Sequence, residues 1–379
     1  MNKKNIHWGL ITAMIAVSLF LAVKGNLLPG LSAKSTNYEK YQILGSAISL
    51  IRYQYVEEPD ALETMEGGYK GLIDALDVMS SYLSKPLLEK FRMLRDQSLP
   101  EPGLVLYKTF GAFPQVIGVK EGSPAEKMGL KYGDFISALD SKSTLNMSMR
   151  EVNLLLKDPL GKPVTLKVLR AEQTEDVIVE RKLLFSECYS FSPLKNTAGR
   201  IKIYSLNSCT EGIKEKVLPL IKEKNIPLVI DLRNCSEGNI LEAQKLVNLF
   251  TSAEKIGHFS NKIGETDYLS ASGDPVLPDI PLVIWTNRGT MGPAEMAAAI
   301  LKDIRKAKVV GVQTTGLMSK QRIFSFPDGS GLLLTTEIFN LESKTDIWEK
   351  GIEPHEKVNP SQDNTPMYAQ ATERALLNK

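Results

Sequence analysis

The sequence predicts an α/β multidomain protein with three parts: an amino-terminal helical region, a compact β-rich domain, and an α/β core with a mainly parallel sheet. Three patterns support this prediction. Apolar residues recur at helical spacing before residue 98, short apolar runs separated by turn residues continue to residue 185, and strand-like and helix-like runs then alternate. A chain of 379 residues with 43% hydrophobic residues is long enough for two or three domains.

The segment 1–34 differs in kind from the rest of the chain. Residues 8–23 are almost all apolar and follow two lysines, which fits a membrane anchor, a cleaved signal peptide or, as a third alternative, a soluble helix. The anchor is favoured because cleavage after Ala33 would leave Leu31 where a signal peptide normally has a small residue. The positive flank predicts that the remainder is extracytoplasmic, on the periplasmic side, either anchored in the inner (cytoplasmic) membrane or secreted after signal cleavage.

Residues 35–98 are predicted to form a helical domain. Apolar residues repeat at intervals of three and four at Tyr41, Leu44, Ala47, Ile48 and Ile51, which is the spacing of one helix face. The stretch SLPEPG at 98–103 combines two prolines with a glycine, and this combination marks a domain boundary.

The compact β-rich domain is predicted over residues 99–185. Strand-like runs lie at 104–107, 116–119, 135–139, 164–169 and 177–181, and a helix-like run lies at 149–157. The stretch EGSPAEKMGLKYGDFI at 121–136 resembles the signature of PDZ domains in bacterial extracytoplasmic proteases, in which glycines form the turns around a short helix. The resemblance implies a PDZ domain with a β-sandwich or barrel-like fold.

A PDZ domain implies a groove that binds polypeptide carboxyl termini, because such domains add an extended peptide beside an edge strand and hold its carboxylate with backbone amides. The carboxylate loop is predicted at Gly103, Leu104, Val105 and Leu106, and the opposite wall at Met149, Val152, Leu155 and Leu156. Val105 replaces a family glycine, which should stiffen the loop and weaken its hold on a carboxylate. Packing of some wall residues into the core is the alternative.

The α/β core is predicted over residues 186–379. Strands are expected at 201–206, 228–232, 282–286 and 308–312, and helices at 211–222, 240–250 and 293–304. Strands that alternate with helices of this length indicate βαβ units and a mainly parallel sheet, with ligand sites at the carboxyl ends of its strands. The segment NRGTMGPAEM at 287–296 lies at one such strand end.

Four motifs resemble, in order, those of the carboxyl-terminal processing peptidases, also called tail-specific proteases. They are SSYLS at 80–84, VIDLRNCSEG at 229–238, FPDGSGLLLT at 326–335 and KGIEPH at 350–355. The resemblance covers residues 38–358 and implies a ββα-type peptidase core that cuts peptides with a serine nucleophile and a lysine general base. It also suggests a homodimer formed through residues 38–97.

Neither member of that serine–lysine dyad is present in this sequence. The family's serine motif places the nucleophile at Gly292 and its lysine motif places the base at Leu317, whereas the glutamine that orients the lysine is retained as Gln321. Glycine has no hydroxyl group, and leucine cannot accept a proton. The oxyanion region differs as well, because Glu237 and Gly238 stand where the family has two glycines, and a carboxylate would oppose a developing negative charge.

Relocated catalysis is the main alternative to this loss. Thr290 lies shortly before Gly292, and Ser319 and Lys320 lie shortly after Leu317. Adjacent side chains of an extended stretch point to opposite faces, so Ser319 and Lys320 are not expected to form a dyad.

Three functions therefore remain open. The first is a non-catalytic protein that binds polypeptide carboxyl termini, or acts as a scaffold or regulator of an active relative. The second is a serine-type peptidase with residual or relocated activity. The third is a structural subunit whose PDZ domain binds nothing, since a fold by itself does not determine a function.

Composition argues against cofactors, metals and nucleic acid. The cysteines Cys188, Cys209 and Cys235 lack C-x-x-C spacing, so no metal site and no cofactor are expected, and a disulfide between Cys209 and Cys235 stays open. The 46 lysines and arginines nearly balance the 44 aspartates and glutamates, for a net charge of +2. With no basic block interleaved with aromatic residues, nucleic acid is not an expected partner.

Overall fold

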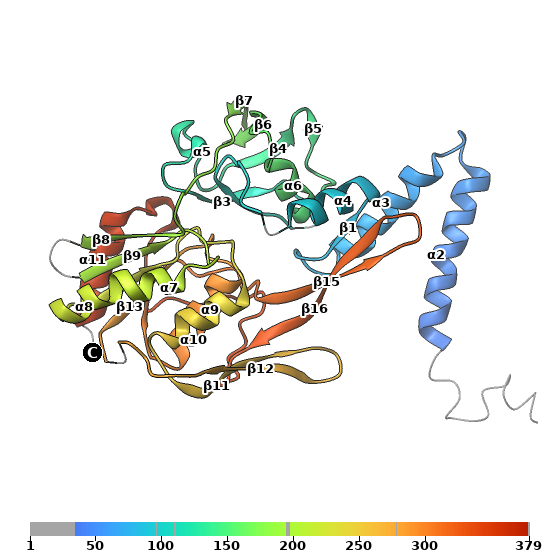
Figure 1. Cartoon of the computed structure of the whole chain (residues 1–379). Coiled ribbons are helices and arrows are strands. Elements are labelled where there is room, and N and C mark those ends of the chain that lie inside the picture. The colour runs from blue at the N-terminus through green and yellow to red at the C-terminus, as the bar shows by residue number, and fades with distance from the viewer. Residues whose placement is uncertain (1–34, 96, 110, 195–197, 278, 378–379) are drawn as a thin grey trace, which may run out of the picture. The chain divides into compact units, whose positions relative to one another are not determined.

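The structure is a computed structural model of the chain (Figure 1). It describes residues 35–95, 97–109, 111–194, 198–277 and 279–377. The chain divides into two compact units, residues 1–67 and 68–379.

The described part of the first unit is helical. Helix α2 spans Ser35–Gln54, and helix α3, Ala61–Asp74, begins in this unit and ends in the second. Among the residues that the structure describes, no helix is both long and apolar enough to cross a lipid bilayer. The apolar run at 8–23, on which the expected anchor or signal peptide depends, lies outside the described residues.

An antiparallel sheet forms the β-rich domain (Figure 1). Its strands follow the order β2-β3-β4-β6-β7, with β5 paired to β4. Their bounds are β2 Leu104–Tyr107, β3 Gln115–Val119, β4 Phe135–Leu139, β5 Lys142–Ser143, β6 Val164–Arg170 and β7 Gln173–Val179. Helices α5 (Pro124–Lys127) and α6 (Met149–Leu156) complete the domain around a core that includes Val116, Ile136 and Leu166. Gly133, with a φ of +94°, turns the chain into β4, a conformation that favours glycine.

A six-stranded sheet organises the α/β core and is parallel except at one edge. Its order is β17-β14-β13-β10-β9-β8, and β8 runs antiparallel to β9. The strands are β8 Tyr189–Leu194, β9 Ala198–Ile203, β10 Leu228–Asp231, β13 Leu282–Thr286, β14 Lys308–Gly311 and β17 Glu356–Lys357. Ile284 packs with α9 and α10 residues on one face of the sheet, and Trp285 packs with Tyr368 of α11 on the other. Helices therefore cover both faces, as a parallel sheet requires.

The helices of this core follow the strands of the parallel sheet. They are α7 Thr210–Gly212, α8 Leu218–Lys224, α9 Ile240–Asn248, α10 Pro293–Asp303 and α11 Thr365–Leu377. A π-helical turn, Ile213–Val217, joins α7 to α8, and a 3-10 turn, Pro360–Gln362, precedes α11.

A second, antiparallel sheet extends the core. Its order is β1-β16-β11-β12, with β15 also paired to β16. The strands are β1 Ser81–Leu83, β11 Ala253–Ser260, β12 Glu265–Ala271, β15 Ser319–Ser325 and β16 Gly331–Asn340. In Figure 1, β15 and β16 run side by side as a long ribbon toward β1.

Strand β1 interrupts the helical domain that the sequence predicts over residues 35–98, before helix α4 (Lys85–Leu94). Tyr82 and Leu83 are buried, and the strand pairs with β16. The Asp77 carboxylate accepts hydrogen bonds from the amides of Met79 and Ser80, both at 2.8 Å, and from the Thr335 hydroxyl at 3.1 Å. These bonds fix the segment to β16, so this stretch is part of the core sheet and not of a separate helical domain.

Contacts between the β-rich domain and the core bring the predicted sites together. Asn234, after β10, donates through Nδ2 to the Val119 carbonyl oxygen at 2.8 Å. Leu154 of α6 packs with Leu83, Leu88 and Leu333. Helix α6 thus lies between the two parts of the chain and contributes to both of their cores.

Candidate functional site

The corner between β13 and α10 is held by a network of hydrogen bonds. Thr290 Oγ1 accepts a bond from the Asn287 amide at 3.1 Å and donates to the Leu232 carbonyl oxygen at 2.9 Å. Asn287 Oδ1 accepts bonds from the amides of Asn234 (2.9 Å) and Gly289 (3.0 Å). The corner is therefore tied to the loop after β10, where the sequence predicts the oxyanion region.

Gly292, the position that the family motif assigns to the serine, lies at the N-cap of α10. Its backbone has φ +57° and ψ −124°, which is a strained conformation for any residue with a side chain. Strained strand-to-helix turns of this kind present the nucleophile in hydrolases that have a nucleophile elbow. A Cβ built at Gly292 meets no other atom within 4 Å. The turn and its open space are present, and the nucleophilic oxygen is absent.

Leu317, the position that the family motif assigns to the lysine, is held at the same corner. Glu295, in the first turn of α10, accepts hydrogen bonds from the amides of Gly316 (2.6 Å) and Leu317 (3.0 Å). The Leu317 side chain is only 2% exposed. Gln321 donates through Nε2 to Ser319 Oγ at 2.7 Å, so the retained glutamine is bound by a serine.

The predicted oxyanion region has a constrained backbone. Gly238 approaches Leu206 so closely that a Cβ would lie 2.6 Å from the Leu206 Cβ. The Leu206 amide donates to the Glu237 carbonyl oxygen at 2.9 Å, and the Met291 amide donates to the Cys235 carbonyl oxygen at 3.1 Å. The amide next to Gly292 is thus already bound within the protein.

The carboxylate of Glu237 is directed toward the β-rich domain. It forms an ion pair with Lys157 at 2.6 Å and lies 3.8 Å from Lys120. Burial alone would raise the pKa of Glu237, but Lys120 and Lys157 outweigh burial and hold this pKa at about 2. The expected opposition to an oxyanion is therefore reduced by two compensating cations.

A buried charged cluster beneath this loop was missed by sequence reasoning. Asp231 forms ion pairs with Arg200 and Arg233, both at 2.7 Å, and with Lys202 at 3.3 Å. Burial opposes ionisation of Asp231, but Arg233 and Lys202 outweigh it and keep the pKa well below its usual range. The sequence does contain a signal for this cluster, because charged residues recur at every second position and alternate residues of a strand share a face. They are Arg200 and Lys202 in one apolar strand, and Asp231 and Arg233 at the end of the next.

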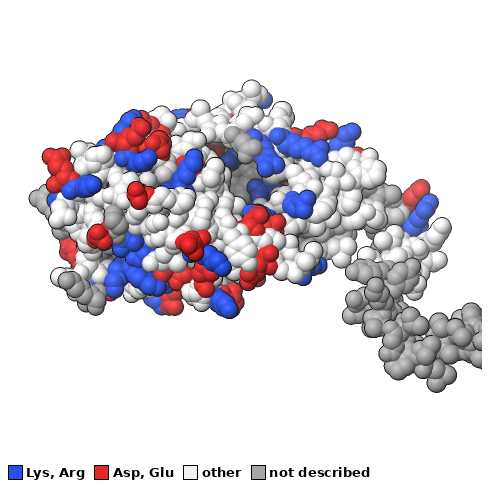
Figure 2. Space-filling view, turned by 60° about the horizontal axis from the view of Figure 1, so that its bottom comes forward, with Lys and Arg blue, Asp and Glu red and all other residues white. Residues whose placement is uncertain are grey.

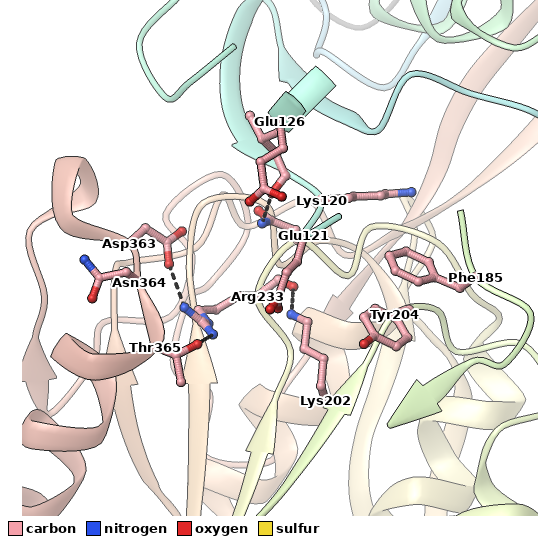
Figure 3. Close-up of a pocket in the computed structure, with 12 residues that line it drawn as sticks. Lys120, Glu121, Glu126, Phe185, Lys202, Tyr204, Arg233, Asp363, Asn364 and Thr365 are labelled. Atoms are coloured by element: carbon pink, nitrogen blue, oxygen red, sulfur yellow. Dashed lines mark hydrogen bonds and ion pairs between the residues drawn. The ribbon is translucent and has the colours of Figure 1, made fainter. Parts of the chain in front are cut away.

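A cavity of about 190 Å³ adjoins this cluster (Figure 3). Lys120 and Glu121 approach it from the β-rich domain, and Tyr204 and Asp363 border it on the core side. Arg233 donates to Asp363 at 3.1 Å and to Thr365 Oγ1 at 3.2 Å. The two lysines that line the cavity pair with carboxylates outside its lining, Lys202 with Asp231 and Lys120 with Glu101.

A second cavity, of about 210 Å³, lies between β2 and α6 and reaches the core. Among the residues that line it are Leu104, Val105 and Leu106 of β2, Met149, Asn153 and Leu156 of α6, and Ser236, Glu237 and Met291 of the core. We call this cavity the groove. Two of the predicted wall residues, Val152 and Leu155, pack instead into the core of the β-rich domain, because helical spacing turns them toward the sheet.

The groove is more basic than the sequence predicts. Lys120, Arg150 and Lys157 also line it. Lys120 is paired with Glu101 at 2.5 Å, while Lys157 is paired with Glu237. Figure 2 shows acidic and basic side chains interspersed over one face of the molecule. The signal in the sequence is the spacing of Met149 and Asn153, which share one face of α6, with Lys157 directly after the helix.

The residues considered for relocated catalysis are engaged in other contacts. The Thr290 hydroxyl both accepts and donates within the corner. Lys320 forms ion pairs with Asp267 and with Glu337 (3.2 Å), and its Nζ lies 4.0 Å from the centroid of the Phe259 ring. Ser319 accepts the bond from Gln321.

All three cysteines are free thiols. Cys209 forms a side-chain hydrogen bond with Cys188, and burial raises the pKa of Cys209 above its usual range. Burial also raises the pKa of Cys235 to about 12. The disulfide left open between Cys209 and Cys235 is not formed in the structure.

Comparison with known proteins agrees with these features. Residues 197–358 match the model of peptidase family S41, and residues 115–170 match that of the PDZ domain. The carboxy-terminal processing protease CtpA of Bacillus subtilis (strain 168) is 29% identical over 353 residues, which cover 92% of this chain and 75% of that protein. A probable CtpA-like serine protease of Staphylococcus aureus (strain COL) is 28% identical over 366 residues, covering 95% and 71%.

The fold also matches a solved structure. A photosystem II D1 C-terminal processing protease superposes with a TM-score of 0.70 at 21% identity, covering 84% of this chain and 88% of that one. The combination of an S41 core, a PDZ domain and these relatives confirms the resemblance found in the motifs. Residues 197–358 therefore form a peptidase S41 core and residues 115–170 a PDZ domain, and the chain is similar to carboxy-terminal processing proteases.

Proposed function

We propose that this protein binds polypeptide carboxyl termini in the groove of its PDZ domain and does not cleave them. The proposal depends on one combination: a groove between an edge strand and a helix adjoins a peptidase corner that has Gly292 and Leu317 in place of the nucleophile and the base. The relatives are named as proteases that process carboxyl termini. This chain would share their class of ligand without their chemical step.

Loss of catalysis is supported by the state of each group that could act. Gly292 supplies no oxygen, and the buried Leu317 supplies no base. Pro293, the residue that follows Gly292, has no backbone N–H to donate to a developing oxyanion. Thr290 and Lys320, the alternative nucleophile and base, are engaged in other contacts.

Peptide binding is supported by the edge position of β2. This strand lies at the end of the order β2-β3-β4-β6-β7, so one side of it can accept an added strand. Leu106, Met149 and Leu156 give the groove apolar walls, and Lys157 places a cation at its end. An extended peptide with an apolar last residue and a free carboxylate fits this combination.

The site of action that we propose is outside the cytoplasm. The two lysines before the apolar run at 8–23 support this orientation. A fusion of alkaline phosphatase to residue 379 tests it, because that enzyme is active only after export. An inactive fusion would contradict the proposed location.

A cleavage assay tests the first half of the proposed function. Peptides of about 15 residues with apolar carboxyl termini are incubated with the purified protein and analysed by mass spectrometry. We expect no products. Turnover that is lost in Thr290→Ala or Lys320→Ala would overturn the proposal and establish relocated catalysis.

A binding assay with the same peptides tests the second half. Because strand addition into a small groove buries little apolar area, we expect dissociation constants of about 1 μM or weaker. Amidation of the carboxyl terminus and the variant Met149→Asp should each weaken binding about tenfold or more. The matched control is Met93→Asp on the exposed face of α4. Binding that is indifferent to both changes would replace peptide binding with a scaffold function.

A further inference from the structure

The Glu237 carboxylate occupies the groove in the way that a ligand carboxylate would. It belongs to the core, yet it lies 2.6 Å from Lys157 of the PDZ domain. Its side chain is 35% exposed, and both residues line the groove. A negatively charged group supplied from outside the PDZ domain is therefore bound by a lysine inside its groove.

The position of Lys157 is at the end of the groove where a carboxylate is expected. Lys157 directly follows α6, and Lys120 directly follows β3. The Lys120 amide donates to the Gly103 carbonyl oxygen at 2.8 Å, which places Lys120 beside the start of β2. A peptide added to β2 would end near this point, since its carboxylate is held by the loop that precedes the strand.

The two lysines differ in their availability. Lys120 is buried, with a side-chain exposure of 6%, and is paired with Glu101 at 2.5 Å. Lys157 has a side-chain exposure of 25% and is paired with Glu237. An incoming carboxylate can therefore exchange with Glu237 at Lys157 more readily than with Glu101 at Lys120.

We propose that Lys157 is the residue that receives the terminal carboxylate of a bound peptide, and that Glu237 occupies this lysine in the free protein as an internal competitor. This inference rests on the proposed function, because it assigns a residue to the same groove. Val105 replaces the glycine that would give the carboxylate loop its freedom. A lysine side chain at the end of the helix supplies a charge-assisted partner in addition to the backbone amides of that loop.

The test measures affinity of the full chain for one peptide with a free carboxylate, by fluorescence anisotropy. Glu237→Gln removes the competitor and leaves Lys157 in place, so binding should tighten about five- to tenfold. Lys157→Met removes the receiving cation, so binding should weaken about fivefold or more. Glu175→Gln, which affects an exposed carboxylate paired with Arg170 at 3.6 Å, is the matched control and should leave the affinity unchanged.

The opposite signs of the two effects make the test specific. Both substitutions break the same ion pair, so a general loosening of the PDZ domain from the core would shift affinity in one direction for both. Equal shifts, or an unchanged affinity in Glu237→Gln, would overturn the inference. The amidated peptide should gain nothing from Glu237→Gln, because it has no carboxylate to exchange.

Failure of this inference can be told apart from failure of the proposed function. If the wild-type protein binds the free peptide better than the amidated one while Glu237→Gln has no effect, only the role of Glu237 is refuted. If neither wild type nor Glu237→Gln binds the free peptide, the groove is not a recognition site and both proposals are wrong.

Discussion

Gly292 retains the backbone of a nucleophile turn, with a φ of +57° and open space around its Cα. Leu317, by contrast, is buried, and its amide is fixed by Glu295. Restoring the family residues, serine at 292 and lysine at 317, would disturb the two positions to different degrees. The Cβ of a serine at 292 would meet no other atom within 4 Å but its backbone would have a positive φ, whereas lysine at 317 would bring an ammonium group into a buried position.

We expect that the double variant Gly292→Ser, Leu317→Lys does not regain efficient peptidase activity. The introduced lysine would place an ammonium group at a buried position, and its desolvation would disturb the corner that has to position the base. Pro293, directly after residue 292, would still lack an N–H for the oxyanion, and losing one oxyanion donor costs about 10²- to 10³-fold in rate. Turnover should remain at least about a hundredfold below that of an active relative with the same peptide.

Mass spectrometry of the peptide products measures this turnover. The single variant Gly292→Ser serves as the control, with melting temperatures recorded for each protein. Activity within tenfold of the active relative in a folded double variant would show that the corner remains competent and that only the dyad was lost.

The motif positions Gly292, Leu317 and Gln321 could be named from the sequence, because short motifs in the same order as in the family fix their place along the chain. The pairing of Lys157 with Glu237 could not. These residues are 80 positions apart, and nothing in their spacing indicates that α6 and the loop after β10 meet.

At the scale of secondary structure, Glu295 joins the start of α10 to the segment after β14. Both of its carboxylate oxygens accept backbone amides, from Gly316 and Leu317. Burial raises the pKa of Glu295 to about 7, although bonds from Thr314 and the two amides oppose this shift. The helix and the segment are therefore coupled through a titratable group.

This coupling predicts a pH-dependent stability. Because the folded-state pKa of Glu295 is raised, its contribution is present below the unfolded value of about 4.5 and is lost as pH rises through about 7. We expect wild type to lose about 3 kcal/mol from this group across that window. Glu295→Gln should lack this component, and at pH 5 it should be less stable by about 1–3 kcal/mol, because its amide group cannot accept both backbone bonds.

Thermal unfolding of both proteins from pH 4 to pH 8 measures the effect. The difference between them isolates Glu295, because all other titrating groups are shared. A difference in stability that is constant with pH would show that Glu295 is ionised throughout and that the amides outweigh its burial.

The parallel strands could be predicted because their buried residues form continuous apolar runs, such as LVID at β10 and LVIWT at β13. The second sheet could not. Strand β15 is half-exposed and largely polar, and β1 has only three residues. Neither shows the alternation of apolar and polar residues from which a strand could be predicted. Strand β7 begins at Gln173, earlier than the apolar run predicts, because its first residues are polar and exposed.

At the scale of the whole described chain, the PDZ domain and the core fall within one compact unit, residues 68–379. The contacts that connect them include the apolar packing of Leu154, the ion pair of Lys157 with Glu237, and the hydrogen bond of Asn234 with Val119. Domain identities and their order could be predicted from the sequence, since turn glycines and motifs are local. The interface could not, because it depends on side chains from distant segments.

Asn234 offers a direct test of this interface. Its side chain donates to the Val119 carbonyl oxygen and accepts a bond from Asn287 Nδ2, both at 2.8 Å, and its φ is +58°. Asn234→Gly removes both bonds without backbone strain, because glycine readily adopts this φ. We expect local opening to become easier by about 1–2 kcal/mol, so amide hydrogen exchange in β3 and in the loop after β10 should accelerate about tenfold while β13 stays protected.

Asn225→Gly, at an exposed helix end with φ +47°, is the matched control and should leave β3 unchanged. If exchange in β3 is the same in both variants, the other contacts across the interface hold the PDZ domain to the core, and the hydrogen bond between Asn234 and Val119 contributes nothing to that attachment.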